Sequence, residues 1–292
     1  MPRGSLTRRI PALVASVLAG LALAAPVAGA KATPLIIGGG PAPQDHSFIA
    51  SMQSTDGQHH CGASLIDQEW LVTAAHCVDG QQPSNVQYRI GSSDRTSGGE
   101  LVEPDEFVVH PQAKQQQAGY DLALVHLSRP VQAEPIAIAD SAPQPGTTLQ
   151  LLGWGQTCPT PKCGEPPVQL KELETTTTEP ANCTGSGEPF DASRELCIDN
   201  QQGRASACYG DSGGPAVVRE GSGYALVGAT SRGLAESCTE KPGVYTSVSA
   251  HADWISQVIG SGGSPGSPDA GSGRDTVPVP PWPVRPGGFT RP

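Results

Sequence analysis

Short apolar runs recur along most of the chain, and turn-forming residues separate them. Each run is rich in branched or aromatic side chains and is bounded by Gly, Pro, Ser, Asn or Asp. The chain also contains 36 Gly and 29 Pro, which disfavour long helices. Regularly spaced short strands of this kind predict an all-β sandwich or barrel. The predicted strands are residues 65–66, 70–72, 86–90, 107–109, 122–127, 149–152, 216–218, 224–227 and 244–248, and one helix is predicted over 251–259.

The first thirty residues have the composition of an export signal. Arg3, Arg8 and Arg9 precede a mostly apolar stretch over residues 10–25, and Ala-Gly-Ala at 28–30 fits a cleavage site. A transmembrane anchor is the alternative, but the stretch is short and ends in small residues and prolines. We therefore predict a signal peptide (1–30), a short propeptide (31–35) and a secreted, extracellular protein with no membrane contact after cleavage. The general and twin-arginine export routes both remain open.

Charge and cysteine content narrow the class of protein further. The chain has 18 basic and 28 acidic residues, a net charge of -10. Nucleic-acid binding needs clustered Lys and Arg, so this balance argues against a nucleic-acid partner. Eight cysteines lie between Cys61 and Cys238, and an even number in an exported chain predicts four disulfides. Their spacing includes no C-x-x-C pair, which argues against a zinc site.

The composition changes sharply at residue 260. Residues 260–292 are rich in Gly, Ser and Pro and lack hydrophobic periodicity. Such a segment cannot bury enough apolar surface to offset the entropy of ordering, so we predict a disordered tail. A polyproline II ligand around residues 280–283, or a spacer that associates with a cell wall, is the functional alternative.

Three short motifs contain the residue types that acyl transfer by a serine requires, namely a nucleophile, a base and an orienting carboxylate. Ser212 lies in the glycine-rich run 210–215, where small neighbours allow a tight turn and leave the hydroxyl accessible. His76 follows an apolar run and precedes a cysteine, and Asp121 begins an apolar run that would draw its carboxylate inward. The other histidines are interpreted as structural or solvated; they are His46, His59, His60, His110, His126 and His251.

These motifs, Thr-Ala-Ala-His-Cys, Asp-Leu-Ala-Leu and Gly-Asp-Ser-Gly-Gly-Pro in this order, resemble the chymotrypsin–trypsin family of serine proteases, as a secreted bacterial member. The resemblance covers residues 36–259. It implies two packed antiparallel six-stranded β-barrels, about 36–143 and 144–250, followed by a C-terminal helix over 251–259. The active site would lie in the cleft between the barrels.

The resemblance also assigns roles to individual residues. It implies that Ser212 is the nucleophile, that His76 is the general base and then the general acid, and that Asp121 orients His76. The backbone N–H groups of Gly210 and Ser212 would form the oxyanion hole. The three cysteine pairs that it implies are Cys61–Cys77, Cys183–Cys197 and Cys208–Cys238, which leaves Cys158–Cys163 as the fourth pair.

Asp211 has a separate role by the same resemblance. In the family, the acid before the nucleophile pairs with the α-amino group that is released when a propeptide is cut. Ile36 begins a run, Ile-Ile-Gly-Gly, that resembles such a new terminus, so Ile36 and Asp211 would form an activation salt bridge. Leu35 departs from the Arg or Lys that trypsin-like zymogens carry before the cut, so a non-tryptic protease or the enzyme itself would make it. The alternative is that Ile36 belongs to a plain first strand.

The residues that the resemblance places around the specificity pocket are uncharged: Ser206, Ser231, Gly233 and Gly243. We therefore expect cleavage after Tyr, Phe, Leu or Met. Arg232 stands where the family usually has Trp. It alters the preference for neighbouring substrate residues, pairs with acidic groups of the substrate, or is neutralised by Glu236 or Glu240.

The resemblance implies no cofactor and no metal for the chemistry. Polypeptide substrates and protein inhibitors are the expected partners of a monomer. A calcium site at the clustered acids Glu100, Glu103, Asp105 and Glu106 stays open, although such acids are more often solvated. Two rival functions also stay open: a catalytically silent homologue that binds a partner, and a structural protein that acts through its tail.

Overall fold

The computed structural model describes Met1 and residues 36–115, 117–184 and 189–261. The predicted signal peptide beyond Met1, the propeptide and residues 262–292 of the predicted tail lie outside the described residues. Among the described residues no helix is both long and apolar enough to span a membrane.

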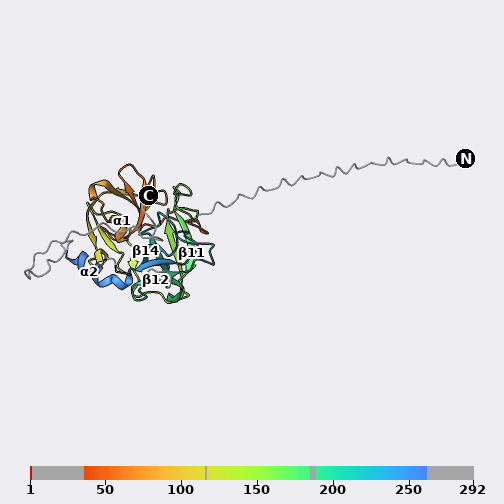
Figure 1. The fold of residues 1–292 in the computed structure, drawn as a ribbon. Coiled ribbons are helices and arrows are strands. Elements are labelled where there is room, and N and C mark those ends of the chain that lie inside the picture. The colour runs from red at the N-terminus through yellow and green to blue at the C-terminus, as the bar shows by residue number, and fades with distance from the viewer. Residues whose placement is uncertain (2–35, 116, 185–188, 262–292) are drawn as a thin grey trace, which may run out of the picture. The chain divides into compact units, whose positions relative to one another are not determined.

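The first sheet is built from strands in the first half of the described chain (Figure 1). Its strand order is β6-β5-β2-β3-β4-β8-β7, and every neighbouring pair is antiparallel. The strands at the two ends of this order, β6 and β7, are separated only by Glu103, so the sheet curls round on itself. The bounds are β2 Ile49–Ser54, β3 His59–Asp67, β4 Trp70–Thr73, β5 Val86–Ile90, β6 Glu100–Val102, β7 Pro104–Val109 and β8 Ala123–Leu127.

The second sheet has the order β1-β11-β10-β13-β14-β15-β12, with β9 paired parallel to β14. Thr177, directly after β11, forms an antiparallel bridge to Ile198 in β12, so this sheet also curls. The bounds are β1 Gly40–Pro41, β9 Ala137–Ile138, β10 Thr148–Gly153, β11 Lys171–Thr176, β12 Glu195–Ile198, β13 Pro215–Glu220, β14 Gly223–Gly233 and β15 Gly243–Ser247.

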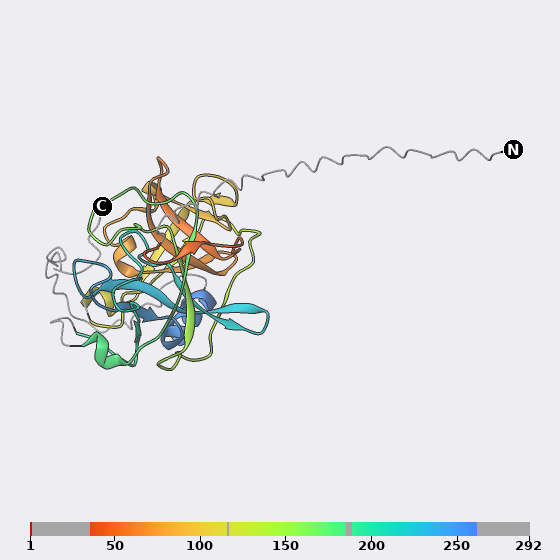
Figure 2. The ribbon, with the colours of Figure 1, turned by 90° about the vertical axis from the view of Figure 1, so that its right-hand side faces the viewer.

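This architecture confirms the predicted fold class. Within the described residues the sheets contain seven and eight strands, because short segments such as β1, β6 and β9 add to the six that were expected in each. The sheets are also interleaved in sequence, since β1 and β9 precede residue 144 and yet pair within the second sheet. Figure 2 shows the orange and yellow strands of the first sheet above the cyan and blue strands of the second.

Helices are short in the described residues. The helix α1 (Ala75–Val78) follows β4 directly, and α2 (Ala252–Gly260) matches the predicted C-terminal helix within a residue. Ile255 of α2 belongs to a buried cluster with residues of both sheets, and the ring of Trp254 contacts His110, directly after β7. The 3-10 turns are η1 Pro83–Asn85, η2 Ala113–Gln115, η3 Pro180–Cys183 and η4 Ser249–His251.

Side-chain alternation explains why the strands form where they do. In β5 the apolar residues Val86, Tyr88 and Ile90 are buried, whereas Gln87 and Arg89 are only half-buried. Successive side chains of a strand point to opposite faces, so this sequence presents one continuous apolar face to the barrel interior.

The structure contains four disulfides, which join the three cysteine pairs implied by the family resemblance and the one remaining pair. Each constrains the unfolded chain and so contributes about 2–4 kcal/mol to stability. Cys61–Cys77 links β3 to α1 and thereby fixes the helical turn that contains His76.

Candidate active site

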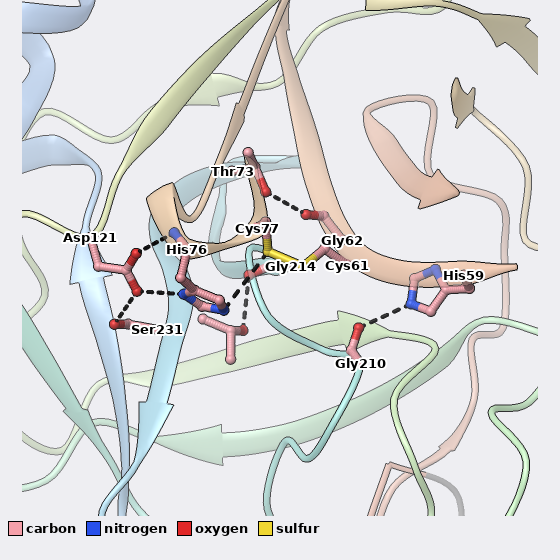
Figure 3. The surroundings of a disulfide bond; sticks show 11 residues. His59, Cys61, Gly62, Thr73, His76, Cys77, Asp121, Gly210, Gly214 and Ser231 are labelled. Carbon is pink, nitrogen blue, oxygen red and sulfur yellow. Dashed lines mark hydrogen bonds and ion pairs between the residues drawn. A yellow bond between two sulfur atoms is a disulfide. The ribbon is translucent and has the colours of Figure 1, made fainter. Parts of the chain in front are cut away.

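His76 and Asp121 lie side by side between the two sheets (Figure 3). The Nδ1 atom of His76 is 2.8 Å from Oδ2 of Asp121, and the backbone N–H of His76 donates to Oδ1 at 3.0 Å. The hydroxyl of Ser231, in β14, also donates to Oδ2 at 2.6 Å. Three donors therefore fix the carboxylate, and they come from both barrels.

These contacts determine the protonation of the pair. Partial burial would raise the pKa of Asp121, but the charge and hydrogen bonds of His76 and the hydroxyl of Ser231 outweigh it and lower the pKa to about 2. An ionised carboxylate can only accept hydrogen bonds, so Nδ1 of His76 must carry the proton that it shares with Asp121. In the neutral imidazole the lone pair then lies on Nε2, which is the arrangement that a general base needs.

Ser212 lies in a tight loop that leads into β13, and this loop reaches the first barrel. The carbonyl of Ser212 accepts a hydrogen bond from the backbone N–H of Gly62 in β3 at 2.8 Å. The next residue, Gly213, has φ +73, and a Cβ there would collide with Thr73, three residues before His76. Only glycine fits this close approach, which brings the Ser212 backbone to the base of α1.

Two peptide planes in the loop of Ser212, Tyr209–Gly210 and Asp211–Ser212, are each held by a hydrogen bond to the carbonyl. The carbonyl of Tyr209 accepts from the N–H of Gln156 at 2.8 Å, and the carbonyl of Asp211 accepts from the N–H of Gly214 at 2.9 Å. Because C=O and N–H point in opposite directions across a trans peptide, the N–H groups of Gly210 and Ser212 face away from those donors.

His59 is a site residue that the sequence analysis did not single out. Its Nε2 is 3.0 Å from the carbonyl oxygen of Gly210, and its Nδ1 is 2.8 Å from the hydroxyl of Ser51. Burial lowers the pKa of His59 to about 3, so the ring is neutral. His59 therefore orients the loop of Ser212, and it lies on the opposite side of the Cys61–Cys77 disulfide from His76 (Figure 3). No local motif marks His59 in the sequence, because its contact with Gly210 spans 151 positions.

The carboxylate of Asp211 is buried and accepts hydrogen bonds from the backbone amides of two segments. Its Oδ1 accepts from the N–H of Gly155 at 2.7 Å, and its Oδ2 accepts from the N–H of Cys208 at 2.8 Å. Burial raises the pKa of Asp211 to about 6, although these two amides act in the opposite direction. Among the described residues no Lys, Arg or His forms an ion pair with it.

Ile36 is fully buried among the apolar residues of the second barrel and has φ +30. Its neighbour Ile37 bridges to Ser206, whose N–H donates to the carbonyl of Ile37 at 3.0 Å. In the uncut chain the nitrogen of Ile36 belongs to a peptide bond and has no charge, so the expected ion pair with Asp211 is not present in this form.

Three of the four residues expected around the specificity pocket lie in the paired strands β14 and β15. Gly233, at the end of β14, pairs directly with Gly243, at the start of β15. Ser231 lies two residues before Gly233 and reaches Asp121 with its hydroxyl. Ser206 is buried beside Ile37, so no charged side chain is contributed by this set.

Arg232 is neutralised, but by neither of the acids expected from the sequence. Its guanidinium forms a two-point contact with Glu195, at 2.5 Å from Nη1 to Oε1 and 3.2 Å from Nη2 to Oε2. Glu236 and Glu240 are closer in sequence but follow β14, whereas Glu195 lies in β12 with its side chain fully buried. The charge of Arg232 is therefore balanced by a carboxylate within the protein.

The described residues contain one compact group of three metal-ligand types: Cys61, His76 and Cys77. Both cysteines are in a disulfide and offer no thiolate, so this group does not fit a metal ion. Two of the four acids considered for calcium have other partners. Glu100 accepts from Arg129 and from the N–H groups of Gln132 and Ala133, and Asp105 pairs with His126.

Comparisons with known proteins agree with this geometry. The sequence model of the family described as Trypsin matches residues 36–255. A protein named Trypsin from Saccharopolyspora erythraea is 32% identical over 225 residues, which are 75% of this chain and 95% of that protein. Trypsin 5G1 from Aedes aegypti is 32% identical over 77% of this chain and 85% of its own length. Trypsin theta from Drosophila melanogaster is 33% identical over 72% of this chain and 80% of its own length.

Proposed function

Because this chain belongs to the trypsin family of serine endopeptidases, we propose that it hydrolyses peptide bonds through an acyl-enzyme formed on Ser212. The observation that carries the proposal is the hydrogen bond from His76 Nδ1 to Asp121. It fixes the tautomer in which Nε2 can accept a proton from a serine hydroxyl.

In the first half of the reaction the Ser212 Oγ attacks the scissile carbonyl carbon while its proton passes to Nε2 of His76. The C–N bond then breaks, and His76 returns the proton to the leaving amine. In the second half a water molecule attacks the acyl-enzyme and gives its proton to His76. The ester bond to Ser212 breaks, and Ser212 takes that proton back. Asp121 stays ionised throughout and stabilises the imidazolium cation.

The oxyanion that forms in both halves would be bound by the backbone N–H groups of Gly210 and Ser212. The support is the orientation of their peptide planes, which the N–H groups of Gln156 and Gly214 hold by the opposite carbonyls. Donors fixed in advance do not reorganise when negative charge develops, and each contributes about 3–4 kcal/mol to the transition state.

Cutting of the chain between Leu35 and Ile36 would activate the enzyme. The new ammonium group of Ile36 would pair with Asp211, whose carboxylate now has only neutral partners. A buried carboxylate without a cation is unfavourable, so the gain on pairing can order the loop that precedes Ser212.

The substrate preference that we propose is for a large apolar or aromatic residue before the cleaved bond. Its support is that Ser206, Gly233 and Gly243 are uncharged and that Glu195 neutralises Arg232. Secretion after removal of residues 1–30, action on extracellular polypeptides as a monomer, and a bacterial origin complete the proposal. The relatives come from both a bacterium and insects, so they do not distinguish the origin.

The direct test is peptide hydrolysis by the secreted chain and by a Ser212→Ala variant. We expect activity on substrates with Phe, Tyr, Leu or Met before the cleaved bond, and none above background after Ser212→Ala. Ser47→Ala, a surface change whose hydroxyl contacts only the carbonyl of Glu134, is the matched control and should retain activity. A wild-type chain that is folded, cut before Ile36 and still inactive would favour the catalytically silent alternative.

A second variant tests the preference alone. Ser206→Asp would place a carboxylate in the proposed pocket, so we expect the preference to move toward Arg and Lys. A wild-type enzyme that already prefers Arg or Lys would contradict the proposed preference and leave the proposed mechanism intact.

A further inference from the structure

The buried carboxylate of Glu195 accepts more hydrogen bonds than an ion pair with Arg232 requires. Its Oε1 accepts from the N–H of Gly119 at 2.9 Å, and its Oε2 accepts from the N–H of Asp191 at 2.9 Å. Two guanidinium nitrogens of Arg232 complete the set, and one of them also donates to the carbonyl of Pro189 at 2.6 Å. Four donors satisfy the carboxylate, which makes its complete burial tolerable.

Gly119 is held from both sides. While its N–H donates to Glu195, its carbonyl is 2.7 Å from Nε2 of His251, in the turn before α2. Gly119 has φ +83, and a Cβ there would lie 2.6 Å from Cβ of Arg194. The segment can therefore pass this close to β12 only with glycine at this position.

Asp121 follows two residues later and meets the same barrel again. Its carbonyl accepts from the hydroxyl of Thr246 in β15 at 3.1 Å, and its carboxylate accepts from Ser231 in β14. Arg232 is adjacent to Ser231 in β14. Ser231 binds the Asp121 carboxylate directly, and Arg232 binds Glu195, which in turn binds Gly119. The contacts to Gly119 and Asp121 come from β12, β14, β15 and the turn before α2, whereas Asp121 is also bound by His76 and leads directly into β8 of the first barrel.

We propose that the Glu195–Arg232 pair is a positioning device that docks residues 119–121 onto the second barrel and so sets the direction of the Asp121 carboxylate toward His76. The proposal rests on the proposed function, because it assigns Asp121 its role there. Glu195 and Arg232 touch no reacting atom and are positioning residues. Arg232 thus serves the catalytic geometry instead of offering a charge to substrate.

The test compares Glu195→Gln with a matched control, Glu100→Gln. Glu100 also accepts from one arginine, Arg129, and from two backbone N–H groups, but it contacts nothing near Asp121. For Glu195→Gln we expect kcat to fall at least about tenfold with KM within about twofold, because a small misorientation of a catalytic group acts on the transition state. We also expect the acidic limb of kcat/KM to shift to lower pH, since a misaligned Asp121 stabilises the His76 cation less.

For Glu100→Gln we expect a lower melting temperature with kcat and the acidic limb unchanged. If Glu195→Gln does not fold, Arg232→Lys is the second variant, because it keeps the charge and loses the two-point contact. We expect a smaller fall in kcat and a smaller shift of the acidic limb. The proposal is overturned if Glu195→Gln or Arg232→Lys lowers only the melting temperature, as the control does.

Hydrogen exchange of the Gly119 amide separates this proposal from the proposed function. We expect slow exchange in the wild type and at least about tenfold faster exchange in Glu195→Gln, whether or not the chain is active. An inactive wild type with a protected Gly119 amide would contradict only the function, whereas an active Glu195→Gln with wild-type kcat would contradict only the positioning device.

Discussion

The pKa values of two aspartates near the proposed site are shifted in opposite directions. Asp121 accepts from an imidazole, a hydroxyl and a backbone amide, and its pKa is lowered to about 2. Asp211 accepts from two backbone amides alone, and burial raises its pKa to about 6. The difference shows that neutral donors do not compensate a buried carboxylate as an imidazole partner does. In the uncut chain, therefore, the proposed catalytic pair is already assembled, whereas Asp211 still lacks a cation.

The largest expected effect is at Asp121. Asp121→Asn replaces an acceptor by a group that also donates, which favours the wrong tautomer of His76. We expect kcat to fall about 10⁴-fold, as the same substitution does in a member of this family. Asp105→Asn is the matched control, because it alters the exposed His126–Asp105 pair, and it should stay within about twofold of wild type. An Asp121→Asn enzyme within tenfold of wild type would contradict the role of Asp121.

The next effect concerns Asp211 in the enzyme that has been cut before Ile36. Removing one partner of a buried ion pair costs about 3–5 kcal/mol, so Asp211→Asn should lower the population of the active conformation by a factor of about 10² or more. The measurement is kcat/KM after terminal sequencing has verified Ile36 as the first residue. Equal kcat/KM for the two cut proteins would show that Ile36 does not pair with Asp211.

A smaller effect is expected in the uncut chain, where stability should depend on pH through Asp211. Its folded pKa of about 6 lies above the unfolded value of 3.8, so between these values the folded state binds more protons. The stability contributed by the protonated group is therefore lost as pH rises through this range. The loss is on the order of 3 kcal/mol, from about two pKa units at 1.36 kcal/mol each.

Urea unfolding of uncut wild type and uncut Asp211→Asn at pH 4 and pH 7 measures this difference. The free energy of unfolding of Asp211→Asn should rise relative to that of wild type from pH 4 to pH 7. His59, whose lowered pKa of about 3 makes stability rise with pH in the same range, is present in both proteins and cancels. A stability difference that is the same at both pH values would contradict the raised pKa of Asp211.

The sequence predicted those strands whose local pattern is strong. The alternation of apolar and polar residues over 86–90 is clear, and β5 has those bounds. By contrast, β11 reads Lys-Glu-Leu-Glu-Thr-Thr and was not predicted, because its residues are mostly polar and one of its two partners, β1, lies in a distant part of the chain. Burial of Lys171 and Thr175 follows from that pairing and leaves no local signature.

In the candidate site, too, residues with a local sequence pattern were predicted and residues without one were missed. His76, Asp121 and Ser212 stand within short motifs, so their sequence neighbours identified them. Glu195 and His59 contact the site across 76 and 151 positions, respectively, and neither lies in a motif of its own. Long-range hydrogen bonds to backbone groups depend on the fold as a whole, and a single sequence does not reveal them.

The most direct test of the account is covalent labelling of the cut enzyme by a fluorophosphonate, read out by intact mass and peptide mapping. The account predicts one adduct per chain, located on Ser212, strongly slowed by Asp121→Asn and abolished by Ser212→Ala. An enzyme that hydrolyses peptides but is labelled elsewhere, or labelled equally well without Ser212, would contradict it.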